Sequence, residues 1–535
     1  MTKRIVARLA VIALAIITVV PLGATAAHAD ASIDGAGSTW SQIAVDQWRA
    51  DVARQGLSIN YQGVGSTSGR VFYYQDQVDF AVSEIPFTSA YRDASGTVST
   101  NEVALAAHRP YAYLPIVAGG TSFMYHLDIN GKRVTNVRFA PETIAKIFTG
   151  VITKWNDPAI VADNPQLRLP ALAIRPVVRS DGSGTTAQFT AFMASQTPDT
   201  WNAFCQRQGV NINPCPSVSL WPDISATSQQ FSDGVAAFVG APYNNGAITY
   251  VEYGYAQQRG FPVASVLNKA GYYTQPTANA VAIALQGVTI NADETQNLEG
   301  VYTFSDARSY PVSSYSYMIV PTTTAAPFNA AKGATLSKFI LYFVCVGQQK
   351  AEQLGYSPLP KNLVQIAFNS VTKIPGHVTP PPIDQCDNPT IRGTFVTGDA
   401  PPPLPGDKVG ATPPTTQPGT SNPSAPGQTN GVPSSGSVAV GIRRSSSSPT
   451  VATGSKAKAS TKSARYVDAA AINSATATRP NGQLSVPDPR DPLSVLLYVA
   501  AAVLFLLAVF GPPALAIALK RRKTTWRGNG PPGGG

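Results

Sequence analysis

Short apolar stretches alternate with helical stretches from about residue 31 to residue 392. The segments "LSINYQGVGS" and "VDFAVSEIPF" are predicted strands that run into turns or loops, and "LAIRPVVRSDGSGTTAQFTAFMA" is a predicted strand, loop and helix start. "GAITYVEYGYAQ" repeats the strand-to-helix step, whereas "SKFILYFVCVGQQKAEQLGY" has helical periodicity. Strands and helices that alternate over about 360 residues indicate an α/β fold with parallel sheets, and this length favours two lobes.

Residues 1–29 have the pattern of a secretory signal peptide. Three basic residues lie within the first eight positions, residues 9–22 are apolar, and "AHA" at residues 27–29 is a small-residue cleavage site. An uncleaved membrane helix is the alternative. We therefore expect the mature chain to be exported.

Residues 493–519 form a span of 27 residues without a charge, and four basic residues follow at 520–523. A helix of this length covers ~40 Å, more than the ~30 Å apolar core of a bilayer. Because cytoplasmic flanks carry an excess of Lys and Arg, residues 520–535 are predicted to be a cytoplasmic tail. The pattern predicts a single-pass protein on the extracellular face of the cell membrane.

Pro, Ser, Thr, Gly and Ala dominate residues 396–490, as in "PPPLPGDKVGATPPTTQPGT". With so few aromatic and branched apolar residues, this segment cannot bury enough surface to offset its chain entropy. It is predicted to be a disordered linker between the globular region and the membrane.

The formal net charge of +10 is distributed unevenly. Residues 401–535 hold 14 basic and 4 acidic residues and the signal peptide holds three basic ones, whereas residues 30–400 hold 23 basic and 26 acidic residues. The basicity therefore belongs to the two ends of the chain, and the folded part is mildly acidic. The composition gives no support for nucleic-acid binding.

All four cysteines lie in the exported part. In an oxidising compartment we expect the disulfides Cys205–Cys215 and Cys345–Cys386, with other connectivities or free thiols as the alternatives. The sequence has no C-x-x-C motif and no Cys/His cluster with metal-ligand spacing. We expect no metal and no other cofactor.

Four polar turns share one chemistry. "GAGSTW" (35–40), "GVGSTSGR" (63–70) and "RSDGSGTT" (179–186) offer hydroxyls and backbone N–H groups at predicted helix starts, where an anion is favoured. The fourth, "VDFAVSE" (78–84), offers carboxylates, the first of which is Asp79. Helix capping is the alternative for each single turn. Three Gly/Ser/Thr turns together, one of them with Arg179, favour an oxyanion site.

The sequence gives little support for an enzyme. "DGSGTT" lacks the lysine of a P-loop. Neither Ser66 nor Ser183 lies in a G-x-S-x-G motif, and we interpret His108, His126 and His377 as surface or packing residues. The polar turns therefore predict binding without catalysis.

Eight short segments follow one another in a distinctive order: "GAGSTW", "INYQGVGSTSG", "VDFAVSE", "ITKWNDPAI", "NPQLRLP", "VVRSDGSGTTAQFT", "DGVAAFV" and "GAITYVEYGYA". In order and spacing they resemble the phosphate-binding component of high-affinity phosphate ABC transporters, from about Asp34 to Ile374. The resemblance implies a two-lobed periplasmic-binding-protein fold (type II) with phosphate buried between the lobes. It implies that residues 30–115 and 312–395 form lobe I and that residues 116–311 form lobe II.

The resemblance also implies a ligand set, with one residue that fixes the arginine. The phosphate-binding residues would be Thr39, Trp40, Ser66, Asp79, Arg179, Ser183, Gly184 and Thr185, and Asp181 would fix Arg179. Arg179 would give charge-assisted donors to two phosphate oxygens, and the hydroxyls would add neutral donors. An ionised carboxylate can only accept, so Asp79 would favour a protonated oxyanion such as phosphate over sulfate.

The chain departs from the family at three points. Trp40 stands where phenylalanine is usual, and Glu84 stands in the loop after Asp79 where the family often has aspartate. The linker and membrane helix replace a soluble form or a lipid anchor.

Two functional hypotheses follow. The first is a monomeric surface receptor that captures inorganic phosphate and delivers it to ABC permease subunits. The alternative is a membrane-anchored receptor or interaction protein with the same fold, which binds phosphate or another oxyanion without feeding a transporter.

Overall fold

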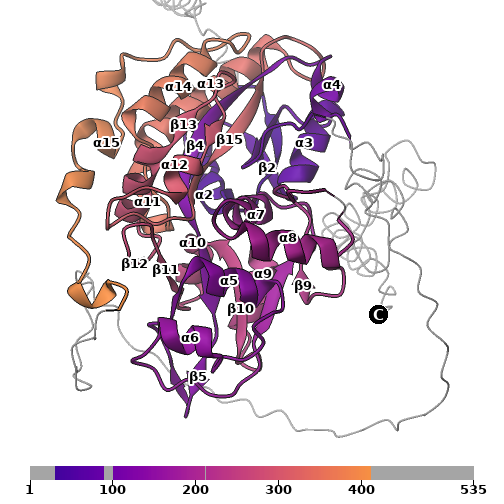
Figure 1. The fold of residues 1–535 in the computed structure, drawn as a ribbon. Coiled ribbons are helices and arrows are strands. Elements are labelled where there is room, and N and C mark those ends of the chain that lie inside the picture. Colours follow the sequence, from indigo (N-terminus) through magenta and orange to yellow (C-terminus); the bar gives the residue numbers. More distant parts are fainter. Residues whose placement is uncertain (1–29, 90–99, 211, 411–535) are drawn as a thin grey trace, which may run out of the picture. The chain divides into compact units, whose positions relative to one another are not determined.

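The computed structural model describes residues 30–89, 100–210 and 212–410. The predicted signal peptide, the linker beyond residue 410 and the predicted membrane helix lie outside these residues. Within the described part, strands and helices alternate (Figure 1), which confirms the α/β class. None of the helices in this part is long and apolar enough to cross a membrane.

The main sheet has eight strands in the order β2-β1-β3-β15-β4-β10-β8-β9. β1 is parallel to β2 and β3, and β8 is parallel to β9 and β10. β15 runs antiparallel to β3 and β4, and β10 runs antiparallel to β4. The strands are β1 (Ile33–Gly37), β2 (Ile59–Gly63), β3 (Phe80–Ser83), β4 (Tyr111–Tyr125), β8 (Arg175–Arg179), β9 (Ser228–Gln229), β10 (Ala247–Glu252) and β15 (Ser313–Pro321).

The long strand β4 joins the two sides of this sheet, which we call lobe I (the side of β2, β1, β3 and β15) and lobe II (the side of β10, β8 and β9). Its N-terminal part pairs with β15 on the lobe I side, and its last five residues, Thr121–Tyr125, pair with β10 of lobe II. Nearly all residues of β4 and all residues of β15 are buried. Continuous burial is typical of strands covered by helices on both faces, so these two strands run through the centre of the core.

Helices cover the sheet in both lobes (Figure 1). In α13, the buried residues Leu336, Phe339, Ile340 and Phe343 recur at helical spacing and face the core. Lobe I carries α2 (Gln42–Ala53), α3 (Ser66–Tyr74), α4 (Glu102–Ala106), α13 (Ala330–Val344), α14 (Lys361–Val371) and α15 (Pro389–Arg392). Lobe II carries α5 (Pro141–Phe148), α6 (Pro158–Asp163), α7 (Gly184–Gln196), α8 (Pro198–Arg207), α9 (Phe231–Gly240) and α10 (Tyr253–Gln258).

Both expected disulfides are confirmed. Cys205 of α8 is bonded to Cys215, and Cys345, directly after α13, is bonded to Cys386. No cysteine of the described residues is free. The second bond ties the C-terminal segment to a helix of lobe I.

Residues 396–410 pack onto the domain, so the predicted start of the linker is wrong. Arg138 of β7 (Arg138–Phe139) donates to Gly406 O at 2.8 Å and to Asp407 Oδ1 at 2.6 Å. Val409 N–H donates to Gly271 O at 2.8 Å. The Pro-rich composition predicted disorder, but partners from lobe II hold this segment. The folded domain therefore includes residues 396–409.

A small hairpin, β13 (Thr289–Ile290) with β14 (Gln296–Asn297), lies against lobe I although the predicted boundaries put it in lobe II. Gln296 N–H donates to Tyr317 OH at 2.5 Å. Ser370 Oγ of α14 donates to Glu294 Oε2 at 2.7 Å. The chain therefore contacts lobe I well before residue 312.

Candidate functional site

Three of the predicted polar turns meet between the two lobes. The turns after β1 and β2 belong to lobe I and the turn after β8 belongs to lobe II, and each follows the carboxyl end of a parallel strand. Thr67 N–H donates to Gly182 O at 3.1 Å. Gly184 N–H donates to Ser66 Oγ at 3.2 Å. The lobes thus touch through backbone and hydroxyl groups of these turns.

Thr39 and Ser66 do not cap the helices that follow them. Neither α2 nor α3 has a side-chain cap at its start. Instead, Thr39 Oγ1 lies 3.0 Å from Ser232 Oγ of lobe II, and Ser66 Oγ donates to Glu84 Oε2 at 2.6 Å. For these two residues the capping hypothesis is wrong, because both hydroxyls serve contacts at the lobe interface.

Arg179 ends β8, and its side chain is only 2% exposed. Asp181 accepts from Nε at 2.7 Å and from Nη2 at 2.5 Å. This bidentate pair fixes the plane of the guanidinium group. Its Nη1 lies 3.2 Å from Ser232 Oγ and 3.4 Å from Thr185 Oγ1. The Nη1 edge is therefore the part of the cation that faces the hydroxyl groups.

Asp181 also sets the start of α9. It accepts from Phe231 N–H at 2.9 Å, and Phe231 has a φ of 63°, a left-handed conformation that is rare for a bulky residue. Ser232 N–H then donates to Thr39 Oγ1 at 3.2 Å. Ser232 is a site residue that sequence reasoning missed. Its only signal was its position directly before the matched segment "DGVAAFV".

The third turn leads into α7. Ser183 Oγ accepts from Thr186 N–H at 3.2 Å, so this residue does cap its helix. Gly184 and Thr185 follow at the first helical positions, where backbone N–H groups lack intrahelical partners. Tyr250 OH lies 2.8 Å from Thr186 Oγ1, and burial raises the pKa of Tyr250 to about 12. Tyr250 is therefore a neutral hydroxyl group beside the start of α7.

Asp79 is not part of this cluster, which contradicts its predicted place among the ligand residues. It precedes β3 at the amino end of that strand. Its Oδ2 accepts from Asp34 N–H at 2.9 Å, and its Oδ1 pairs with Lys332 Nζ at 2.8 Å. Because a four-residue strand is ~13 Å long, Asp79 cannot reach the carboxyl end, where the turns meet.

Glu84 occupies the place that was predicted for Asp79. It directly follows β3 and is 1% exposed. The hydroxyl groups of Ser38, Ser66 and Ser316 donate to its carboxylate. Gln188 of lobe II donates to its backbone carbonyl at 2.8 Å. The buried carboxylate at the lobe interface therefore belongs to Glu84.

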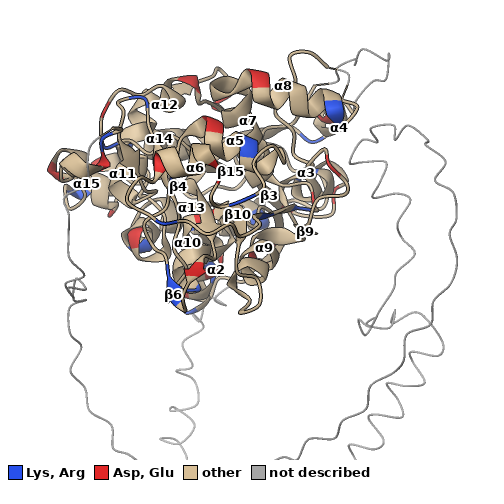
Figure 2. Cartoon of the chain, turned by 60° about the horizontal axis from the view of Figure 1, so that its bottom comes forward, with Lys and Arg blue, Asp and Glu red and all other residues tan. Residues whose placement is uncertain are grey.

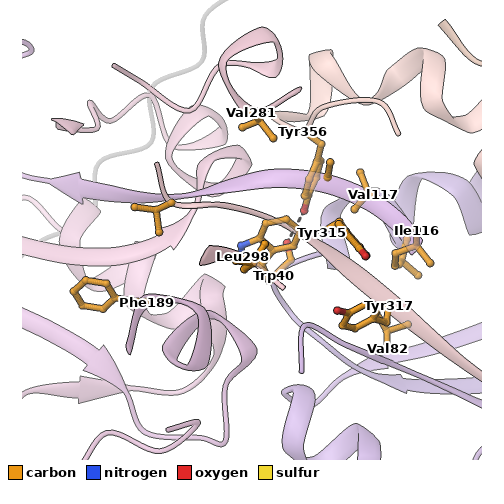
Figure 3. Close-up of a cluster of buried hydrophobic side chains, with 14 of the residues drawn as sticks. Trp40, Val82, Ile116, Val117, Phe189, Val281, Leu298, Tyr315, Tyr317 and Tyr356 are labelled. Carbon is orange, nitrogen blue, oxygen red and sulfur yellow. Dashed lines mark hydrogen bonds between the residues drawn. The ribbon is translucent and has the colours of Figure 1, made fainter. Parts of the chain in front are cut away.

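The side chain of Trp40 points into the core. Its ring packs edge-on against Tyr356 at a centroid distance of 5.7 Å, and its Nε1 donates to Thr121 Oγ1 at 3.3 Å. Tyr356 OH donates to Trp40 O at 2.6 Å (Figure 3). Trp40 therefore anchors the first turn to β4 and to lobe I.

The cluster thus combines the cation Arg179, the carboxylate of Asp181 that holds it, the carboxylate of Glu84 and several hydroxyl groups from both lobes. These groups can surround a small oxyanion that offers both acceptor oxygens and one hydroxyl hydrogen. Nowhere in residues 30–89, 100–210 and 212–410 do three or more His, Cys, Asp or Glu side chains gather in a metal-binding arrangement.

Comparisons with known proteins show the family of this chain. The model of the PBP superfamily domain matches residues 23–346. The phosphate-binding protein PstS of Xylella fastidiosa (strain Temecula1) is 31% identical over 334 residues, which cover 62% of this chain and 83% of the relative. The chain belongs to the PstS family within the PBP superfamily. The resemblance predicted from the sequence is confirmed at the level of the family.

Two further proteins are similar to this chain. Phosphate-binding protein PstS 3 of Mycobacterium tuberculosis (strain H37Rv) is 28% identical over 372 residues, covering 65% of this chain and 91% of the relative. A crystal structure of a phosphate-binding protein from Stenotrophomonas maltophilia is 16% identical, covers 66% of this chain and 97% of its own, and has a TM-score of 0.45.

Proposed function

We propose that this PstS-family protein captures inorganic phosphate between its two lobes and delivers it to an ABC permease. The observation that carries the proposal is the convergence of Arg179, Glu84 and the Gly/Ser/Thr turns in one buried cluster. The names of its relatives, which are phosphate-binding proteins, support the choice of anion.

The positive charge for the anion comes from Arg179. Lys/Arg and Asp/Glu are interspersed over the elements of the described region (Figure 2). Since Asp181 occupies Nε and Nη2, the Nη1 edge serves the ligand together with the hydroxyl groups of Thr39, Ser183 and Thr185. The hydroxyl group of Ser66 already donates to Glu84. Fixed hydrogen bonds and the start of α7 then hold the anion even though residues 30–400 are net acidic.

Glu84 provides the selectivity that the sequence had led us to assign to Asp79. An ionised carboxylate accepts but does not donate, so it suits an oxyanion that still carries a proton. Phosphate at neutral pH carries such a proton, whereas sulfate would place unprotonated oxygens against the carboxylate. This repulsion favours phosphate by discriminating against its competitor.

Binding is proposed to occur without catalysis. The phosphate-binding residues come from both lobes, so a ligand between them stabilises the closed state and shifts the population toward it. The same arrangement releases phosphate when the lobes separate at the permease.

Export and anchoring are part of the proposal and are supported by sequence pattern alone. Residues 1–29 direct export, and residues 411–490 link the domain to a membrane helix at 493–519 with a cytoplasmic tail at 520–535. The domain then works as a monomer on the extracellular face of the membrane.

Calorimetry with the full chain in detergent tests the central claim. After removal of bound ligand, phosphate should bind tightly, whereas sulfate and molybdate should bind weakly. Absence of phosphate binding by the ligand-free protein would contradict the proposal. Restoration of phosphate uptake in a deletion strain then distinguishes delivery to a permease from binding alone.

A further inference from the structure

Ser316 lies on β15, the strand between β3 of lobe I and the shared strand β4. It is fully buried. Between Ser316 and Tyr317 the register of β15 against β4 shifts, so the strand is irregular at this point. Such irregularities redirect side chains relative to a regular ladder. The direction of the Ser316 side chain is therefore set by this local irregularity of the strand.

The hydroxyl of Ser316 reaches a residue 232 positions away in the chain. It donates to Glu84 Oε1, which also accepts from Ser38 Oγ, while Glu84 Oε2 accepts from Ser66 Oγ. Ser41 Oγ lies 3.1 Å from Ser316 Oγ. A serine hydroxyl has only one hydrogen to donate, and a carboxylate is the stronger acceptor. The hydroxyl group of Ser316 therefore donates its hydrogen bond to Glu84 and not to Ser41.

The three serines occupy most of the hydrogen-bond acceptor positions of Glu84. A carboxylate has about four lone-pair positions, and three hydroxyl groups from three separate segments use three of them. Oε2 also lies against Gly184, the first residue of α7. One acceptor position remains for a hydroxyl group of a ligand, and its direction depends on how the carboxylate is held.

We propose that Ser316 is a positioning residue for Glu84, which fixes the direction of the carboxylate and so sets the preference for a protonated oxyanion over a fully deprotonated one. The inference rests on the proposed function, because it requires an oxyanion beside Glu84. Without Ser316, Oε1 keeps one donor and the torsions of the glutamate side chain gain freedom. Acceptance of a ligand hydroxyl and repulsion of a bare oxygen then both weaken.

Ser314 provides a matched control on the same strand. It lies two residues before Ser316, so both side chains point to the same side of the strand. It is 2% exposed, and its hydroxyl group has no hydrogen-bond partner in the structure. Ser314→Ala therefore removes a buried hydroxyl from β15 without touching Glu84.

The experiment compares Ser316→Ala, Ser316→Thr and Ser314→Ala with the unaltered full chain by calorimetry against phosphate and sulfate. We expect the phosphate-to-sulfate affinity ratio to fall about tenfold in Ser316→Ala, since one hydrogen bond to a charged group is lost. Ser316→Thr, which keeps the hydroxyl, and Ser314→Ala should keep the ratio.

Each outcome has a distinct meaning. An unchanged ratio in Ser316→Ala, or an equal loss of affinity for both anions, overturns the proposal, since a purely structural role weakens both alike. A similar fall of the phosphate-to-sulfate affinity ratio in Ser316→Thr or Ser314→Ala also contradicts the proposal. Failure of the unaltered chain to bind phosphate contradicts the proposed function instead.

Discussion

Gly184 of lobe II lies directly against the carboxylate of Glu84 in lobe I. A Cβ atom at position 184 would come within 1.9 Å of Glu84 Oε2 and 2.6 Å of Ser66 Oγ. The two lobes approach this closely only because the first residue of α7 has no side chain. The site and the closed arrangement of the lobes therefore depend on the same contact.

Gly184→Ala should hinder closure and leave each lobe folded. The added methyl group can be accommodated if the lobes separate, so we expect phosphate affinity to fall about 100-fold, or about 2.8 kcal/mol. Calorimetry measures the affinity, and small-angle scattering with phosphate tests whether the particle stays expanded. Gly234→Ala in α9 is the control, because a Cβ atom at position 234 would lie 3.5 Å from its nearest neighbour, Gln229 Cβ, which is an ordinary contact distance. Equal binding by both variants would contradict the prediction.

Replacement of each carboxylate by an amide tests whether Glu84, and not Asp79, sets the preference for phosphate over sulfate. Glu84→Gln should narrow the phosphate-to-sulfate preference, because an amide can donate to a bare sulfate oxygen. Asp79→Asn should leave the preference unchanged and lower the melting temperature, because it weakens the partly buried pair with Lys332. Competition calorimetry and thermal melts measure the two effects. A narrowed preference in Asp79→Asn would restore the assignment made from the sequence.

The parts of the site that are local in sequence could be predicted. Arg179, Asp181 and Ser183 lie within five residues of one strand-to-helix turn, and such a turn can gather a cation and helix-start donors without distant partners. The order of segments identified the family. Strand and helix alternation gave the α/β class for the same reason, because it depends on short-range periodicity.

The choice between Asp79 and Glu84 could not be made from pattern. The two residues flank the same short strand, and only the direction of β3 in the sheet decides which of them meets the turns. Ser316 carried no signal, because its partner is 232 positions away. The order in residues 396–410 was missed for a similar reason, since Arg138 of lobe II supplies the contacts.

Asp181→Asn tests whether the arginine must be held in place. One carboxylate oxygen accepts from Arg179 Nε and Phe231 N–H, and the other accepts from Arg179 Nη2. Asparagine would turn an N–H₂ group toward one of these donors, so the guanidinium should lose its fixed orientation. We expect phosphate affinity to fall about tenfold to 100-fold.

The control is Asp128→Asn, which alters another partly buried Asp–Arg pair of lobe II, with Arg133. Calorimetry of both variants against phosphate separates a local role from a general loss of charge. The prediction is wrong if Asp181→Asn and Asp128→Asn bind phosphate equally well.

Glu252 gives the domain a predictable dependence on pH. It ends β10 with its side chain fully buried, and Oε2 accepts from Gly254 N–H at 2.8 Å. Burial raises the pKa of Glu252 well above its ordinary value of 4.5. The unfolded chain therefore loses this proton at a lower pH than the folded domain, and the contribution of Glu252 to stability declines as pH rises above 4.5.

Glu252→Gln keeps the shape of the side chain and removes the ionisation. Near pH 4 the variant and the unaltered protein should have similar free energies of unfolding. From pH 5 upward the variant should become progressively more stable by comparison, by up to about 1.4 kcal/mol per pH unit for one proton, until the pH passes the pKa of Glu252 in the folded domain. Denaturant titrations at each pH measure the difference. Glu142→Gln, at a half-exposed position in α5, is the control and should show no such trend. A constant difference between Glu252→Gln and the unaltered protein across this range would show that Glu252 ionises alike in the folded and unfolded states.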